Sequence, residues 1–285
     1  MEYVLFILIN INMYIVLAVS LNLIMGYAGL ISVSHAAFMG IGAYVTTILM
    51  VQFGWSFLLT LPAALLFAAV ISAIIAVPSL RVKGDHYIVM SFGIQFILTS
   101  LLNNLNITNR AMGFAGIPKP SFFGFAFESN FALLFVSLGF MLVCVLFAAR
   151  LAHAPFGLIL KAIREDENAT ESLGKNVVFY KVAVFVIGCS LAALTGSFFA
   201  SIVSFIDPFS FTLDESIFIS TLAIIGGSGT IRGSIVGVPL LIAFPEILRF
   251  MQVPTTVAGP LRLIFYGLLI ILFMRFRPQG IIKEY

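Results

Sequence analysis

The chain alternates long hydrophobic runs with short polar connectors. A membrane-spanning helix needs roughly 20 apolar residues, and nine runs reach or approach that length. They cover residues 3–25, 36–52, 56–77, 86–105, 131–149, 181–205, 216–226, 233–250 and 260–276. The pattern predicts an all-α transmembrane fold, a polytopic helical bundle of about eight or nine spanning or re-entrant helices, in a single domain over residues 1–285.

Two glycine-rich segments interrupt this pattern, one in each of two related halves of the chain. They cover residues 26–44 and 226–237, and the second cuts short the run 216–226, which we interpret as a broken or re-entrant helix. Matching breaks in two halves are typical of a transport pathway, although small residues also serve tight helix packing without substrate contact. The candidate pathway residues are the polar side chains of these segments, Ser32, Ser34, His35, Ser228 and Thr230.

His35 has a second interpretation, because a lone histidine among small and apolar residues is more often a hydrogen-bonded packing residue than a ligand. The chain has no second histidine or cysteine at metal-ligand spacing from it, so no metal site is expected. Cys144 and Cys189 both lie inside apolar runs and are predicted to be inert core residues.

Composition agrees with lipid as the solvent. The chain is 61% hydrophobic and 9% charged, with a mean hydropathy of +1.14, whereas soluble domains carry about 25% charged residues. The net charge of +3 is too small to indicate a nucleic-acid partner. The run 3–25 lacks a basic start and a cleavage site, so we expect it to be a retained membrane helix.

Loop charges predict the orientation, because cytoplasmic loops carry an excess of lysine and arginine. When the spans are counted, one side receives most of the basic connectors, namely Arg81, Lys83, the stretch 150–181, Arg275, Arg277 and Lys283. The other side receives the N-terminus, Asp207, Asp214, Glu215 and the connector 106–130, whose Arg110 and Lys119 go against the rule. We expect the first side to be cytoplasmic.

Residues 150–181 form the one substantial polar stretch of the chain, and we expect this cytoplasmic loop to contact a soluble partner. Inside it, apolar residues recur at helical spacing, at Phe156, Ile159, Leu160 and Ile163. Pro155 suits a helix start, and Gly174 suits a helix end. The stretch therefore predicts an amphipathic helix at the inner membrane surface, which either docks a partner or simply rests on lipid headgroups.

The energy source is expected to lie outside this chain. Charged residues within the apolar runs are few, which argues against a proton- or sodium-coupled carrier. The chain also contains neither a phosphate-binding loop of the form Gly-x-x-x-x-Gly-Lys-Ser/Thr nor a dinucleotide-binding glycine fingerprint. If ATP drives the protein, a partner subunit binds it, and the cytoplasmic helix is the natural docking element.

The chain resembles a known family, the M-type permease subunits of bacterial ABC importers for branched-chain amino acids. The resemblance covers nearly the whole chain, and its ordered motifs are specific only as a set. Before the polar stretch 150–181, the motifs are residues 22–29, 32–44, 80–87, 108–113 and 116–118. Within that stretch they are Phe156, Gly157, 162–165, Asn168, Ala169, Leu173, Gly174, Tyr180 and Lys181, and after it they are 226–230, Pro245, Glu246 and 277–280.

The resemblance implies a non-catalytic, multi-pass subunit of the bacterial plasma (inner) membrane with no cofactor of its own. It implies a second, H-type permease subunit, two cytoplasmic ATPase subunits that bind ATP and Mg, and an extracytoplasmic substrate-binding protein. It also implies that residues 156–174 are the coupling helix that enters an ATPase groove. The residues expected to carry this coupling are Arg164, Glu165, Glu167, Glu171 and Gly174.

Departures from the family pattern bear on the cargo. Val33 and Ser34 stand where we expect leucine and glycine, Ser234 stands where proline is common, and Thr170 interrupts an alanine-rich face. Leucine, isoleucine and valine are the first expectation, and urea, short amides or another small polar solute are the second. A stand-alone ion-coupled carrier or channel is the alternative from a different class. A membrane enzyme is disfavoured because the chain lacks a nucleophile–base or metal constellation.

Overall fold

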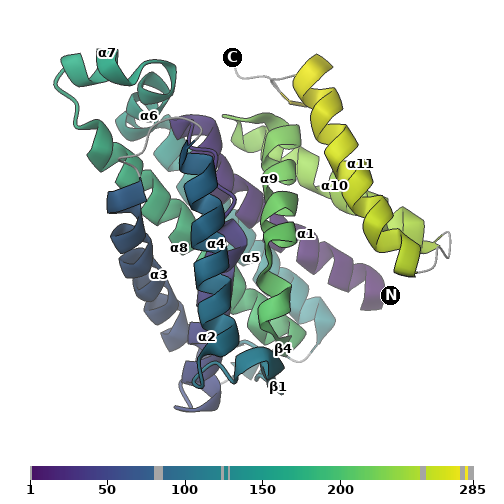
Figure 1. The fold of residues 1–285 in the computed structure, drawn as a ribbon. Coiled ribbons are helices and arrows are strands. Elements are labelled where there is room, and N and C mark those ends of the chain that lie inside the picture. Colours follow the sequence, from purple (N-terminus) through teal and green to yellow (C-terminus); the bar gives the residue numbers. More distant parts are fainter. Residues whose placement is uncertain are drawn as a thin grey trace.

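A computed structural model describes residues 2–79, 86–122, 125–127, 129–250, 255–276 and 280–281. Within these ranges the protein is a bundle of helices (Figure 1). The strands of the described part form two antiparallel pairs, β1 (Phe114–Ala115) with β4 (Phe205–Ile206), and β2 (Ser121–Phe122) with β3 (Phe125–Ala126). The predicted all-α membrane fold is therefore confirmed.

The apolar helices follow the nine predicted hydrophobic runs. They are α1 (Glu2–Asn22), α2 (His35–Val51), α3 (Phe57–Ser79), α4 (His86–Asn104), α5 (Asn130–His153), α8 (Val177–Val203), α9 (Leu213–Gly227), α10 (Ile231–Phe250) and α11 (Thr255–Phe276). Short helical turns are η1 (Leu23–Tyr27), which continues α1 as a π-helix, η2 (Arg110–Met112) and η3 (Pro208–Phe211). Among the described residues, five helices are long and apolar enough to cross a membrane individually, and six if α9 and α10 count as one bent span.

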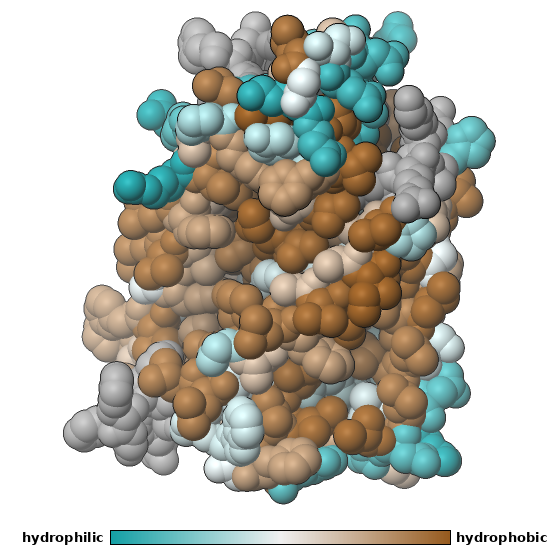
Figure 2. Space-filling model, turned by 90° about the vertical axis from the view of Figure 1, so that its left-hand side faces the viewer, coloured by the Kyte–Doolittle hydropathy of each residue, from teal (hydrophilic) through white to brown (hydrophobic). Residues whose placement is uncertain are grey.

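The outer surface of the bundle is hydrophobic around its middle. Figure 2 shows brown, hydrophobic side chains over the central band of one face and teal, hydrophilic side chains toward its two ends. Large apolar side chains such as Leu66 on α3, Ile97 on α4 and Val143 on α5 are more than half exposed. Lipid hydrocarbon is the solvent that such a band requires.

Small residues bring the central helices α2 and α8 close together. A Cβ atom on Gly42 would lie 1.9 Å from the carbonyl oxygen of Ala193, and one on Gly196 would lie 1.8 Å from that of Met39. Backbones can approach this closely only where a side chain is absent. The core of the bundle is built on this pair, with α1 and α9 packed beside it.

The predicted break after the run 216–226 is confirmed. Helix α9 ends at Gly227, and the chain bends by 120° into α10. Gly229 adopts a positive φ of 86°, which favours glycine. The chain end returns to this point, because the amide of Ile281 donates to the carbonyl of Ile225 at 3.0 Å.

The predicted amphipathic helix over residues 156–174 is instead two helices, α6 (Pro155–Glu165) and α7 (Glu167–Ser172). Asp166 separates them in an extended conformation, and its carboxylate accepts a hydrogen bond from the amide of Ala169 at 3.0 Å. The short side chain of aspartate can accept a hydrogen bond from a nearby backbone amide, which favours a new helix start over a continuous helix. The predicted start of α6 at Pro155 is confirmed, and its apolar face packs inward through Leu160 and Ile163.

The two ends of the bundle differ in what they carry. Helices α6 and α7 lie at one end, where Figure 1 also places the last turns of α11, while the β1–β4 pair lies at the opposite end. The acidic residues Asp214 and Glu215 begin α9, away from α6. Several residues used to predict the orientation lie outside the described residues, namely Arg81, Lys83, Arg277 and Lys283.

Candidate functional site

The two glycine-rich interruptions meet in space. The first break, residues 23–34, comprises η1 and the non-helical segment that leads into α2, and the second break, residues 228–230, joins α9 to α10. A Cβ atom on Gly26 would lie 2.2 Å from the backbone nitrogen of Gly229. The two breaks are therefore in direct backbone contact, with no side chain between them.

Asn22 joins the two breaks. It is the last residue of α1 and is almost completely buried. Its side-chain nitrogen donates toward the carbonyl oxygens of Gly227 (3.0 Å) and Thr230 (2.9 Å) and the hydroxyl of Ser234 (2.9 Å). Its side-chain oxygen accepts from the amide of Gly229 at 2.8 Å. One carboxamide thus bonds backbone groups at the end of α9, within the second break and immediately before α10.

Helix α6 rests on the first break through two cations. Arg164 donates from Nη1 to the carbonyl oxygen of Gly26 at 2.6 Å, and Lys161 lies over the ring of Tyr27, 5.3 Å from its centroid. Gly29 has a φ of 70°, and a Cβ atom there would lie 3.0 Å from the Cγ of Arg164. Cations are favoured at the carboxyl end of a helix, which is where α1 and η1 end.

Three of the predicted pathway residues lie inside the first break and at its end. The hydroxyls of Ser32 and Ser34 are 3.1 Å apart, and the Nε2 of His35 is 2.8 Å from the hydroxyl of Ser20. The amide of Val33 donates to a serine hydroxyl on α4 at 3.1 Å. All three predicted residues are buried, so the structure brings them together and encloses them within the chain.

The start of α2 is closed by side chains that sequence reasoning missed. The amide of Ala36 donates to Ser216 Oγ at 2.9 Å, and that of Ala37 donates to Gln95 Oε1 at 3.1 Å. Gln95 also donates to the carbonyl of Phe211 at 2.8 Å. These amides already have partners, so the helix start is not an open anion site. The available signal was the presence of Gln95 and Ser216 inside apolar runs, where polar residues are costly.

The other two predicted pathway residues, Ser228 and Thr230, lie at the second break and are half-buried. The hydroxyl of Thr230 donates to the carbonyl of Gly227 at 3.1 Å. The predicted pathway therefore has an enclosed part in the first break and a more accessible part in the second. Within the described ranges, no group of three histidine, cysteine, aspartate or glutamate residues could hold a metal ion.

The predicted coupling residues divide into two groups. Arg164 turns toward the first break, and Glu167 forms an ion pair with the buried Lys181 at the start of α8. Glu165 and Glu171 are exposed, as is Gly174, whose φ of 77° ends this surface segment. The first group ties α6 and α7 to the bundle. The second group faces outward, and its member Glu165 also forms an ion pair with Arg164 at 3.1 Å.

Large apolar side chains are exposed beside these acids. Leu158 on α6 is 64% exposed, and Leu173 after α7 is 78% exposed. Exposed apolar side chains rimmed by charge are typical of a surface that another protein covers. A polar pocket of about 190 Å³ lies beside the contact between the first break and α6, with Arg164, Glu167 and Lys181 in its wall.

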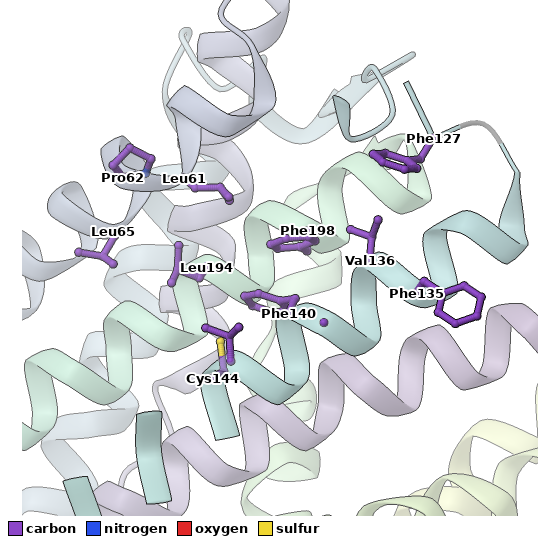
Figure 3. A pocket seen from close by; sticks show the side chains of 12 residues that line it. Leu61, Pro62, Leu65, Phe127, Phe135, Val136, Phe140, Cys144, Leu194 and Phe198 are labelled. Atoms are coloured by element: carbon purple, nitrogen blue, oxygen red, sulfur yellow. The ribbon is translucent and has the colours of Figure 1, made fainter. Parts of the chain in front are cut away.

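A larger crevice of about 660 Å³ lies between α3 and α5, over α8. Figure 3 shows apolar side chains from these helices around it. The rings of Phe140 and Phe198 stack at its floor with their centroids 4.1 Å apart. This crevice offers no charged or hydrogen-bonding side chain to an amino acid, so it is unsuited to be a site for a zwitterion.

Comparison with known proteins agrees with this architecture. Residues 3–274 match the family described as "Branched-chain amino acid transport system / permease component". The high-affinity branched-chain amino acid transport system permease protein LivM of Escherichia coli is 32% identical over 94% of this chain and 67% of its own length. The probable LivM of Methanocaldococcus jannaschii is 24% identical over 98% of this chain and 92% of its own length.

The permease protein LivH of Escherichia coli also matches, at 24% identity over 94% of this chain and 91% of its own length. No solved structure matches the chain. The family match covers most of the sequence, and the hydrophobic helices account for a multi-pass protein of the inner membrane. The chain therefore belongs to the family of permease components of branched-chain amino acid transport systems.

Proposed function

We propose that this chain is one of two membrane subunits of an ATP-driven importer that carries leucine, isoleucine and valine. The cargo rests on the relatives named for branched-chain amino acid transport. The structure supports a transport role through one observation, the contact between two helix breaks directly beneath the surface helix α6. Urea or short amides remain the second candidate cargo for the same kind of importer.

The proposed complex contains an H-type permease subunit, two cytoplasmic ATPase subunits with ATP and Mg, and an extracytoplasmic binding protein. This chain would catalyse no reaction. The proposed ATPase contact is the outward side of α6 and α7, where Glu165, Glu171, Leu158 and Leu173 are exposed together. Apolar side chains would enter a groove of the ATPase, while the acids would fix its register.

The proposed pathway runs past the two breaks. Ser228 and Thr230 are accessible enough to meet a substrate in the state described, whereas Ser32, Ser34 and His35 would meet it only after the first break opens. Hydroxyls and free backbone groups bind a zwitterion weakly, so it can leave again. ATP binding in the partner subunits would move α6 and thereby change the shape of the breaks.

The docking proposal is tested by reversing one outward charge. We expect Glu171→Lys to lower co-purification of the ATPase subunits at least tenfold, because Glu171 is exposed and lies outside the contact between α6 and the first break. Glu165 is left unchanged, since its carboxylate forms an ion pair with Arg164 at 3.1 Å. Asp214→Lys, an exposed acid at the opposite end of the bundle, is the control and should leave assembly unchanged. Full ATPase recovery with Glu171→Lys would refute docking at this surface.

Arg164→Glu is also expected to reduce ATPase docking without affecting membrane insertion. The structure makes this variant less selective, because Arg164 also holds the carbonyl of Gly26. Glu171→Lys is therefore the sharper test of docking alone.

The cargo is tested by labelled leucine uptake in cells that lack this chain and in cells that regain it. Loss on deletion, recovery on restoration, and competition by unlabelled isoleucine and valine are the expected results. Competition by urea instead would move the proposal to the second cargo. Leucine uptake that persists without ATPase subunits would favour a stand-alone carrier.

A further inference from the structure

The Asn22 carboxamide has more acceptors within reach than it can serve. An asparagine side-chain nitrogen carries two hydrogens, yet three acceptor oxygens lie within 3.0 Å of it, on Gly227, Thr230 and Ser234. The amide of Gly229 can only donate, so it fixes the orientation of the carboxamide oxygen. The nitrogen can therefore exchange one acceptor for another without leaving a buried hydrogen unpaired. Such a group can stay bonded while the second break changes shape.

A continuous line of close contacts connects this group to the cytoplasmic surface. Arg164 on α6 donates a hydrogen bond to the carbonyl oxygen of Gly26 at 2.6 Å. A Cβ atom on Gly26 would lie 1.9 Å from the Asn22 side-chain oxygen and 2.2 Å from the nitrogen of Gly229. The Asn22 carboxamide is therefore packed against both glycine backbones, and packed interiors transmit displacement because they compress little.

The surroundings of Arg164 leave room for movement. The polar pocket of about 190 Å³ lies beside the contact between the first break and α6, with Arg164 in its wall, so the space next to this side chain is not filled. The link of α6 to the break consists of the guanidinium bond, the Arg164 stem against Gly29 and Lys161 over the ring of Tyr27. A shift of α6 would therefore act on η1 at a defined point.

We propose that Arg164 and Asn22 are positioning residues that act in series, transmitting movement of α6 through η1 to the bend between α9 and α10. The proposal rests on the proposed function, in which an ATPase moves α6. Arg164 would displace the end of α1, and Asn22 would convert that displacement into a new shape of the second break. Neither residue needs to contact the substrate.

The test uses the complete complex in proteoliposomes with its binding protein, and measures labelled leucine moved per ATP hydrolysed. Arg164→Met keeps the aliphatic stem but loses the bond to Gly26, and should lower this ratio at least tenfold while the ATPases stay bound. Arg164→Lys, which retains a charged donor, should recover most of it. Arg150→Met, an exposed arginine at the end of α5, is the matched control.

Asn22→Ala should lower the same ratio, whereas Asn12→Ala should not. Asn12 is a second buried asparagine on α1, bonded to Ser137 of α5 at 3.1 Å and remote from both breaks. A fall of equal size for Asn12→Ala would show a general packing effect and overturn the proposal. If Asn22→Ala does not assemble, Arg164→Met still decides the outcome, because the side chain of Arg164 is only partly buried, at 29% exposure.

The combination of Arg164→Met with Asn22→Ala distinguishes a route in series from two separate effects. Residues in series should give a double variant no worse than the poorer single variant. If the two losses multiply in the double variant, Arg164 and Asn22 do not act in series. A normal leucine-to-ATP ratio in Arg164→Met would refute transmission from α6 through Arg164 altogether. Failure of the proposed function would look different, because the wild-type complex would then bind no ATPase or move no leucine.

Discussion

The first break is long and held from several sides, whereas the second is short and held chiefly through one side chain. Ser91 and Gln95 on α4 and Ser216 on α9 serve amides in and after the first break. The second break depends on Asn22, whose donor has interchangeable acceptors. A segment fixed by several independent partners resists movement, so we infer that the α2 end of the first break, residues 33–37, is the anchor in the state described. The start of the first break, η1, and the second break are then the adjustable elements.

The largest expected effect comes from filling the contact that the two breaks share. Gly26→Ala would place a methyl group 2.2 Å from the nitrogen of Gly229 and against Asn22. We expect a loss of about 3 kcal/mol in the free energy of unfolding, at the upper end for overpacking. Thermal unfolding in detergent micelles measures it. Gly139→Ala on α5, where a Cβ meets nothing within 4 Å, should change little, and equal losses for the two would contradict the contact.

Removing a bond that holds the first break should lower the free energy of unfolding by less than Gly26→Ala does. Gln95→Leu removes the acceptor for the amide of Ala37 and the donor to Phe211. Leaving such buried groups unpaired should lower the free energy of unfolding by about 2 kcal/mol. Asn104→Leu is the control, because this exposed asparagine on the same helix bonds to Ser100 one turn away. A stable Gln95→Leu protein would show that the first break is not an anchor.

Thiol accessibility should separate the breaks directly. A water-soluble maleimide should modify Ser228→Cys at least tenfold faster than Ser34→Cys, because Ser228 is half-buried and Ser34 is enclosed. The native Cys144 and Cys189 are buried and set a low background. The difference should shrink when ATP and binding protein cycle the complex. Equal rates in the resting complex would contradict the distinction between the breaks.

The smallest effect should come from the second break itself. Ser234→Ala removes one of the three acceptors near Asn22, and the nitrogen keeps two others. We expect a loss of no more than about 1 kcal/mol, the size of one ordinary hydrogen bond. Urea or thermal unfolding of the purified protein would measure it. A loss as large as that of Gln95→Leu would mean that the Asn22 acceptors are not interchangeable.

The positions of the membrane helices, the break after α9 and the packing face of α6 could all be predicted from sequence, because each is a local pattern. The length of a hydrophobic run indicates whether a helix can span the bilayer, and glycine indicates where a helix can be interrupted. The division of the surface segment at Asp166 was missed, since one aspartate is compatible with both a continuous helix and a new cap.

The amino-acid sequence determined a polytopic helical membrane protein with a charged surface helix and two glycine-rich interruptions, because lipid demands long apolar helices and backbone breaks need small residues. Only the tertiary structure decided that the interruptions touch, that Asn22 and Arg164 link them to α6, and that Ser32, Ser34 and His35 are enclosed. These contacts join residues far apart in the chain, and no local pattern of polarity specifies which distant carbonyl a side chain will meet.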